Sequence, residues 1–396
     1  MLDSIYIGMS GLTAYSKGLQ TISNNVANMN TPGFRVSTPR FADLSYERQF
    51  NFRDTATRDQ SFGSGVYYDQ SLLDFRQGEI SKSNGPLDLA IQGNGFIPVV
   101  DKGVVRYVRT AQFSMSKEGL LVDANTSASL AQRGPDGTFI AWSLADKKID
   151  PPKPTSTIQF SDNLSSGASD FSVPNVVVYD PQGNKHTLTI RFKPDKDGLQ
   201  GSWKVTVEDA DGKDLYQGNL AFVGGMPEPG SDVLKVTMPV KGASPFSFNL
   251  DFSTGVTSYS AGTFSSLRVA KSDGSAAGDI ASMSVSESGE LMLGYSNGQS
   301  ASAGVVTLAK FTNPQQLMQL GRGLFDASHA DGVEYATSHQ AGLGTLLSGS
   351  VEGSNVDLSI EFGRLILIQR GFQASSQVVS TANEMLMQLF QMRGQG

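Results

Sequence analysis

Residues 355–393 read NVDLSIEFGRLILIQRGFQASSQVVSTANEMLMQLFQMR, and the rest of the chain is best understood from this stretch. Apolar residues recur there every seven positions, and others follow three positions after their heptad partners. This pattern is typical of a helix that packs lengthwise on another helix. Without proline, the stretch predicts one uninterrupted helix about 60 Å long. The expected seam consists of Leu358, Leu365, Ile368, Phe372, Val379, Ala382, Leu386 and Leu389.

The beginning of the chain has the same design. Its expected seam consists of Ile5, Leu12, Tyr15, Leu19, Ile22, Val26 and Met29. Residues 31–33 (TPG) are expected to end this helix, because proline disfavours a helical residue before it and glycine supplies the turn. Ser354 with Asp357 three positions later resembles a capping box and predicts where the C-terminal helix begins.

Small residues lie on or beside both seams: Gly8, Ser16, Ser23, Ser375 and Ser376. Small side chains allow close approach but bury little apolar area. We therefore interpret the seams as surfaces that hold only when several copies of the chain pack together. The alternative is an ordinary antiparallel helix pair within one monomer.

Composition limits the classes of protein to consider. A chain of 396 residues is too long for a single core and suggests two or three domains. The 43 glycines and a charged fraction of 17% favour a β-rich body with many turns. The net charge of −7 argues against nucleic acid or an anionic membrane as partner. The absence of cysteine excludes disulfides and thiolate metal sites.

The chain order predicts a nested layout in a mainly β, multidomain α+β protein. Residues 1–34 and 355–396 would form a terminal helical domain with coiled-coil-like packing, and 35–70 a connector. Residues 71–150 with 276–354 would form a middle β-rich domain, and 151–275 an outer β-sandwich or barrel, bounded by the proline-rich run at 150–154. Residues 87–91 (LDLAI) and 187–192 (TLTIRF) alternate with period two, which predicts a strand in each; in the second, Leu188, Ile190 and Phe192 should share one face. The connector interleaves arginines with aromatics, as single-stranded nucleic-acid sites do, but acidic residues cancel most of its positive charge.

Catalytic and ligand-binding patterns are weak. The three histidines, His186, His329 and His339, are more typical of turns and surfaces than of an active site. Residues 93–95 (GNG) lack the third glycine of a dinucleotide loop. Residues 209–214 (DADGKD) lack the EF-hand glycine and glutamate positions and favour a hairpin turn. We expect no enzyme, cofactor or metal.

Several separated blocks resemble the bacterial flagellar rod and hook axial proteins. They are residues 24–28 (NNVAN), 31–35 (TPGFR), 87–96 (LDLAIQGNGF), 354–358 (SNVDL) and 369–374 (QRGFQA). Residues 179–189 and 308–314 are similar to the hook members, whereas the rod members are shorter and lack a comparable middle domain. The residues of this chain that match the motif positions of that family are Asn24, Asn25, Ala27, Asn28, Gly33, Phe34, Asn355, Asp357, Gln369 and Arg370.

This resemblance implies a subunit of a helical polymer, the short curved tube that links the flagellar motor to its filament. The implied partners are further copies of the chain, the distal rod protein, the hook cap, the hook–filament junction proteins and the flagellar export apparatus, with no nucleic acid and no membrane insertion. The implied location is the extracellular flagellum, reached by type III export without a cleavable signal peptide. A distal rod protein and a surface adhesin with a β-rich body remain the alternatives.

Overall fold

The computed structural model describes residues 2–44, 46–48, 61–195, 201–240 and 244–394. The connector residues Phe50, Phe52, Arg53 and Arg58 lie outside this part of the chain. The chain divides into two compact units. Unit 1 comprises Met1–Ala145, Met283–Met292 and Ser302–Gly396, and unit 2 comprises Asp146–Ser282 and Leu293–Ala301. The β-rich, multidomain character expected from the sequence is therefore correct.

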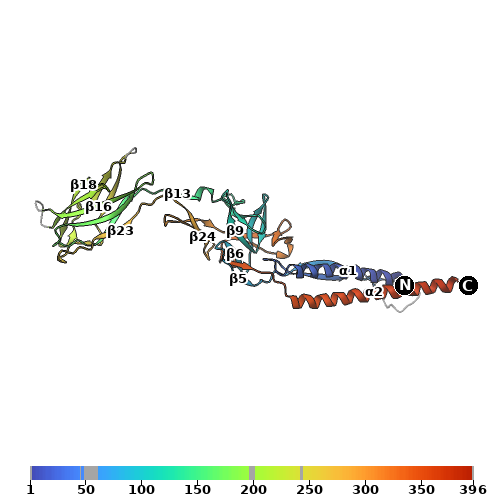
Figure 1. The fold of residues 1–396 in the computed structure, drawn as a ribbon. Coiled ribbons are helices and arrows are strands. Elements are labelled where there is room, and N and C mark those ends of the chain that lie inside the picture. Colours follow the sequence, from blue (N-terminus) through green and yellow to red (C-terminus); the bar gives the residue numbers. More distant parts are fainter. Residues whose placement is uncertain (1, 45, 49–60, 196–200, 241–243, 395–396) are drawn as a thin grey trace. The chain divides into compact units, whose positions relative to one another are not determined.

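Two long helices belong to unit 1 (Figure 1): α1 (Leu2–Ala27) and α2 (Leu358–Gly394). The predicted start of the C-terminal helix is wrong by three residues. The backbone N–H groups of Ser359 and Ile360 donate to Asp357 Oδ1 at 2.8 and 3.2 Å, so Asp357 caps α2 in place of Ser354. Among the described residues, no helix has the length and apolar character needed to span a membrane.

The body of unit 1 is a ten-stranded sheet in the order β28-β29-β8-β7-β11-β10-β9-β6-β31, with β12 beside β11. Returning strands join early ones, since β29 pairs with β8 and β31 with β6. The bounds are β6 (Asp88–Gln92), β7 (Ile97–Asp101), β8 (Val104–Val108), β9 (Thr110–Met115), β10 (Leu121–Asp123), β11 (Ser129–Arg133), β12 (Phe139–Ala141), β28 (Met318–Gly321), β29 (Leu324–Asp326) and β31 (Thr345–Ser348).

The described part of this unit also contains four two-stranded sheets: β1-β4, β2-β3, β5-β32 and β27-β30. Their strands are β1 (Ser37–Asp43), β2 (Tyr46–Arg48), β3 (Ser61–Gly63), β4 (Val66–Leu73), β5 (Ile80–Lys82), β27 (Leu308–Phe311), β30 (Val333–Ala336) and β32 (Ser350–Glu352). The strand predicted at residues 87–91 is confirmed by β6, but its period-two alternation does not produce an exposed face, because every residue from Asp88 to Ile91 is buried. This strand lies between β9 and β31, and both of its faces are covered.

Unit 2 consists mainly of two five-stranded sheets that share one apolar core. The first runs β15-β16-β17-β18-β19, and the second runs β20-β21-β14-β22 with β23 also on β14. The bounds are β14 (Thr157–Asn163), β15 (Phe171–Tyr179), β16 (Lys185–Pro194), β17 (Ser202–Glu208), β18 (Asp214–Val223), β19 (Met226–Pro227), β20 (Val233–Met238), β21 (Phe246–Asp251), β22 (Val256–Thr257) and β23 (Arg268–Ser272).

The core of unit 2 follows the predicted alternation. Leu188, Ile190 and Phe192 of β16 point into it, and the intervening threonines and arginine are partly exposed. Phe160 of the second sheet stacks on Phe252 with ring centroids 4.5 Å apart, and Phe192 of the first sheet meets Phe252 edge-on. Side chains of both sheets interdigitate in this way, as in a sandwich.

A further sheet, β13-β24-β25-β26, forms where the chain leaves unit 1 and later returns. Its strands are β13 (Ile149–Asp150), β24 (Gly278–Val285), β25 (Glu290–Tyr295) and β26 (Ser300–Val305). The described chain also has two short 3-10 helices, η1 (Ala145–Lys147) and η2 (Pro314–Gln316).

Candidate functional site

The terminal helices α1 and α2 pack on each other within one chain. Their pairing is antiparallel, because successive contacts run up one helix and down the other: Gly8 with Val379, Gly11 with Ser375, Tyr15 with Gly371, Gly18 with Ile368, and Asn25 with Glu361. An intramolecular pair was one of the two interpretations left open by the sequence. In this register, Met385 would lie opposite residue 1, so the last turns of α2 extend beyond α1.

Small residues make this contact. The buried positions of α1 are Gly8, Gly11, Ala14, Gly18, Ile22 and Asn25, spaced by three and four residues. A Cβ atom on Gly8 would lie 2.6 Å from Val379 Cγ2, and one on Gly11 would lie 2.5 Å from Ser375 Oγ. Glycine is therefore required for the helices to approach this closely.

The predicted seam residues lie mostly at the flank of this contact. Ile22, Ile368 and Ala382 are buried, whereas Met29, Phe372 and Leu389 are exposed. The others are half-buried: Ile5, Leu12, Tyr15, Leu19, Val26, Leu358, Leu365, Val379 and Leu386. Their role in polymerisation stays a prediction.

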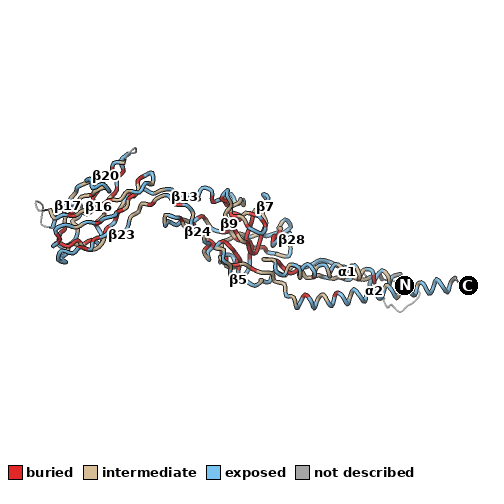
Figure 2. Tube along the Cα trace, in the orientation of Figure 1, coloured by how far each residue is buried: buried red, intermediate tan, exposed pale blue. Residues whose placement is uncertain are grey.

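Much apolar surface on both helices has no partner within the described chain. Figure 2 shows α2 as largely exposed along its length. Leu367 is 69% exposed and Phe390 is 71% exposed. The other large apolar residues exposed on the two helices are Tyr6, Ile7, Met9, Ile360, Phe362, Ile366, Phe372, Val378, Met385, Met387, Leu389 and Met392. Exposed apolar area this extensive is typical of a surface that binds another molecule.

The β1–β4 hairpin packs beside α1. The ring of Phe41 lies between Tyr15 and Tyr68, with centroid separations of 5.4 and 6.2 Å. The hydroxyls of Thr21 and Tyr68 are 3.0 Å apart and hydrogen-bonded. Val66 N also donates to Ser10 Oγ at 3.2 Å, so the connector is held against α1 by aromatic packing together with polar contacts.

Asn25 joins three elements where the helices reach the β-rich body. Its side chain is fully buried. Nδ2 donates to Ser37 O of β1 and to Glu361 Oε2 of α2, each at 2.8 Å, and Oδ1 accepts from Ser37 N at 3.0 Å. These bonds fix the ends of both helices to the first strand of the connector.

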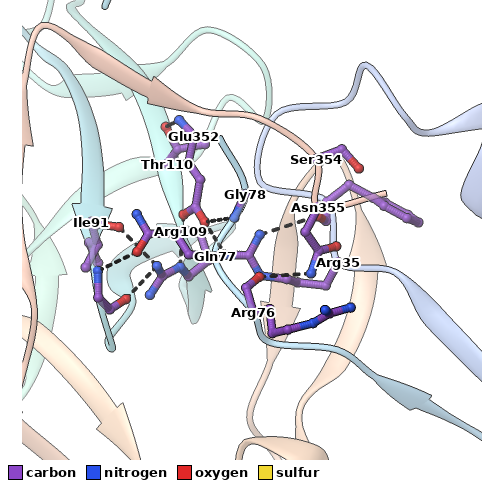
Figure 3. A network of polar contacts seen from close by, with 12 residues as sticks. Arg35, Arg76, Gln77, Gly78, Ile91, Arg109, Thr110, Glu352, Ser354 and Asn355 are labelled. Carbon is purple, nitrogen blue, oxygen red and sulfur yellow. Dashed lines mark hydrogen bonds and ion pairs between the residues drawn. The ribbon is translucent and has the colours of Figure 1, made fainter. Parts of the chain in front are cut away.

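Glu352 is the centre of a buried polar network in which residues from both ends of the chain meet (Figure 3). Its side chain and that of Arg35 are both 0% exposed, and Arg35 Nη2 donates to Glu352 Oε1 at 2.6 Å. Arg109 Nε donates to Glu352 Oε2 at 3.1 Å, and Gly78 N donates to Oε1 at 2.9 Å. The single negative charge of Glu352 therefore compensates part of the positive charge of two buried guanidinium groups.

Arg109 ties this network to the loop after β6. Its Nη2 atom donates to Gly93 O at 2.7 Å and to Ile91 O at 3.0 Å, and Nη1 donates to Gly95 O. Burial lowers the pKa of the Arg109 guanidinium, and the adjacent Glu352 carboxylate opposes that shift. Without this carboxylate, the site would hold uncompensated positive charge.

Asn355 closes the network on the side of α2. Its Oδ1 atom accepts from Val36 N at 2.7 Å, and its Nδ2 atom donates to Asp74 O at 2.7 Å and Arg76 O at 2.9 Å (Figure 3). This use of the side chain explains why Asn355 precedes α2 and does not form its first turn. Nearby, the hydrogen bond from the Arg76 side chain lowers the pKa of Asp74.

Three family models match the chain. Residues 5–35 match "Flagella basal body rod protein", residues 144–275 match "Flagellar basal body protein FlaE D2 domain", and residues 347–392 match "Flagellar basal body rod FlgEFG protein C-terminal". The flagellar hook protein FlgE of Escherichia coli is 29% identical over 97% of this chain and 98% of its own length. The FlgE hook protein of Salmonella typhimurium is 28% identical with the same coverage.

The chain is thus similar to flagellar hook proteins over nearly its whole length. A crystal structure of Helicobacter pylori flagellar hook protein FlgE2 has a TM-score of 0.44 and 12% identity, and it covers 67% of this chain and 98% of its own. The near-complete coverage of the sequence relatives, together with the D2 match in the middle, favours the hook protein over a distal rod protein or an adhesin.

The residues that match the hook-family motifs fall into three groups. Asn25, Gly33, Phe34 and Asn355 take part in the joint between the helices and the body, and Gly33 N donates to Glu352 O at 2.9 Å. Asn28 Nδ2 donates to Asn24 O at 2.8 Å, which satisfies a carbonyl at the end of α1, and Asp357 caps α2. In contrast, Ala27, Gln369 and Arg370 are exposed.

Sequence reasoning missed Glu352, Arg109 and the structural role of Arg35. Glu352 lies just before the C-terminal motif at residues 354–358. It is buried because it points to the same, inward face of β32 as Ser350. A lone glutamate in a short strand carries no signal that it will meet two arginines more than 240 residues earlier in the chain.

The other polar candidates have structural explanations. Asp209 and Lys213 close the β17–β18 turn, with Gly212 at φ +76°, so the hairpin prediction is confirmed. His186 Nε2 lies 3.0 Å from the buried Asp180 Oδ2. Burial raises the pKa of Asp180, but hydrogen bonds from His186, Asn184 and Gln182 outweigh it and bring that pKa to about 2. Within the described chain, no group of three or more His, Asp or Glu is arranged to hold a metal.

Proposed function

We propose that this chain is the structural subunit of the flagellar hook and that many copies assemble through their terminal helices into a helical tube. The observation that carries the proposal is the exposed apolar surface along α2 and the first half of α1. Burying such surface against neighbours is favourable by about 25 cal/mol per Å². A contact between different faces of successive copies does not close on itself and generates a helical filament.

The domain layout is part of the proposal. Residues 1–34 with 355–396 would line the tube, residues 71–150 with 276–354 would form the layer around them, and residues 151–275 would form the outside, with 35–70 as the connector. The polar network of Glu352, Arg35 and Arg109 supports this layout. Buried ion pairs and several hydrogen bonds make the connection between the β-rich body and the helices firm enough to transmit torque.

The chain is a component of the flagellar hook and basal body, as its relatives are. We further propose that it contacts copies of itself, and at the two ends of the tube the distal rod protein, the hook cap and the hook–filament junction proteins. Its delivery by the flagellar export apparatus belongs to the same proposal.

The experiment compares tube formation by the purified chain and by single variants at rising concentration, with electron microscopy as the readout. Leu367→Asp should raise the concentration needed for tubes about 30-fold or more, because it removes one buried leucine per subunit contact. Gln373→Asp, at an exposed polar position of the same helix, is the matched control. Tubes of Leu367→Asp at the wild-type concentration would contradict the proposal, provided that circular dichroism shows both variants to be folded.

A further inference from the structure

Three asparagines of the chain are followed directly by glycine: Asn84, Asn94 and Asn297. An asparagine in such a pair can deamidate without an enzyme, because glycine has no side chain to hinder the attack of its backbone nitrogen on the asparagine Cγ atom. The reaction requires a backbone N–H that is free of hydrogen bonds and a side-chain amide that can rotate. The three sites differ in these requirements and in the charges around them.

Asn297 is held in an unreactive arrangement. Its Nδ2 atom donates to Asp150 Oδ2 and to Ala276 O, each at 2.8 Å, and its Oδ1 atom accepts a further backbone hydrogen bond at 3.0 Å. The nitrogen that would attack, Gly298 N, donates to Tyr295 O at 3.0 Å. Both the amide and the attacking nitrogen are therefore occupied.

Asn84 and Asn94 are not restrained in this way. Both side chains are exposed. Among the residues that the structure describes, neither side-chain amide has a hydrogen-bond partner, and neither Gly85 N nor Gly95 N donates a hydrogen bond. The two sites therefore have the same reacting groups, equally available, and their difference lies in the neighbouring charges.

Positive charges surround the peptide between Asn94 and Gly95. Arg109 Nη1 donates to Gly95 O, and Asn94 O accepts from Gly344 N at 2.7 Å. Asn94 and Gly95 line a cavity of about 240 Å³ together with the side chains of Arg109 and Lys310. The hydrogen bond to Asn94 O and the two cations stabilise negative charge on Gly95 N when it loses its proton, and on the side-chain oxygen of Asn94 when the ring closes.

A negative charge lies beside the other available site. A Cβ atom added to Gly85 would be 2.6 Å from Asp88 Oδ1, so this carboxylate lies against the glycine whose nitrogen would attack Asn84. The carboxylate opposes the loss of a proton from Gly85 N, since two negative charges would then lie close together. Asn84 is therefore a natural reference for Asn94 within the same chain.

We propose that Asn94 is a site of spontaneous modification, at which deamidation produces aspartate and isoaspartate as the protein ages. Gly95 N gives its proton to hydroxide and attacks Asn94 Cγ. The bond between Cγ and Nδ2 then breaks, and the nitrogen takes a proton from water and leaves as ammonia. A second water molecule opens the resulting succinimide at either carbonyl. Water is the only other reactant.

The isoaspartate product should weaken the buried network around Glu352. It places an additional carbon atom in the main chain between Gly93 and Gly95, whose carbonyls both accept hydrogen bonds from the Arg109 guanidinium. That guanidinium is planar and is also held by Glu352. A lengthened main chain cannot keep both carbonyls in place, so we expect modification to loosen Arg109.

The test follows the three sites in one sample of the full-length chain kept at mildly alkaline pH. Mass spectrometry of its peptides measures deamidation at each site over time, once in buffer and once in urea. In the folded chain, Asn94 should deamidate several times faster than Asn84, and Asn297 should scarcely react. In urea, where the folded surroundings are lost, Asn94 and Asn84 should react at similar rates.

Lys310→Gln provides the matched variant, because it removes the charge but keeps a side chain that can donate to Ala341 O as Lys310 does. It should slow deamidation of Asn94 severalfold and leave Asn84 unchanged, whereas Lys310→Arg should keep the wild-type rate. Asn94 reacting no faster than Asn84 in the folded chain would overturn the proposal. So would an unchanged Asn94 rate in Lys310→Gln that tryptophan fluorescence shows to be folded. Both measurements use the unassembled chain, so their outcome is separate from that of the proposed function.

Discussion

Removing the carboxylate of Glu352 should unfold the joint between the terminal helices and the body. In Glu352→Ala, the guanidiniums of Arg35 and Arg109 stay buried without their anion, and Gly78 N loses its acceptor. Breaking a buried ion pair by removing one partner costs about 3–5 kcal/mol, and an unsatisfied backbone donor costs about 1 kcal/mol or more. We therefore expect unit 1 to lose about 4 kcal/mol or more of its free energy of unfolding, a large share of what a typical domain has.

The two tryptophans make a clean assay possible. Trp142 is buried in unit 1 and Trp203 is buried in unit 2. In a Trp203→Phe background, the fluorescence of Trp142 during urea unfolding reports unit 1. In a Trp142→Phe background, Trp203 reports unit 2. Glu352→Ala should move the Trp142 transition to lower urea and leave the Trp203 transition in place.

The matched control is Glu208→Ala, which removes the carboxylate from a partly exposed pair with Arg191 in unit 2. Exposed pairs contribute about 0–1 kcal/mol, so the Trp203 transition should scarcely move. A loss below about 1 kcal/mol for Glu352→Ala in the Trp142 transition would refute the reasoning. So would an equal shift of both transitions.

Three further outcomes are expected. Gly8→Ala should destabilise the helix pair by about 1–3 kcal/mol because its Cβ would overlap Val379. The Cβ of Gly363→Ala meets no neighbour, so this variant should stabilise α2 by about 1 kcal/mol. The melting temperature should therefore fall for Gly8→Ala and rise for Gly363→Ala. Asn25→Ala should cost about 2–3 kcal/mol, since Ser37 and Glu361 lose buried partners, and hydrogen exchange at the end of α1 should rise. The pKa of Asp180 is about 2 in the folded chain against an ordinary 3.8. Its contribution to stability is therefore complete above pH 3.8 and is lost as the pH falls towards 2; Asp180→Asn should flatten the acid dependence of the Trp203 signal over that range.

Local patterns in the sequence were sufficient for the type and position of the main elements. Heptad spacing predicted both terminal helices, and the alternation of Leu188, Ile190 and Phe192 predicted a half-buried strand that the structure has. These features depend on near neighbours in the chain, whose spacing directly sets which residues share a face. The start of α2 was misplaced because the side chain of Asn355 forms hydrogen bonds with the backbone of Val36, Asp74 and Arg76, which lie about 280 or more residues away in the sequence.

The sequence by itself determined that this chain has two long helical ends around a β-rich, glycine-dense interior, because periodicity and turn composition are local properties of a polymer. Only the tertiary structure decided that Gly8, Gly11 and Gly18 form the contact between the helices. It also decided that Glu352 balances Arg35 and Arg109, and that the last turns of α2 have no opposing α1 residue. Close approach and charge pairing depend on which distant residues meet, and register between distant segments is set by the packing of the whole unit.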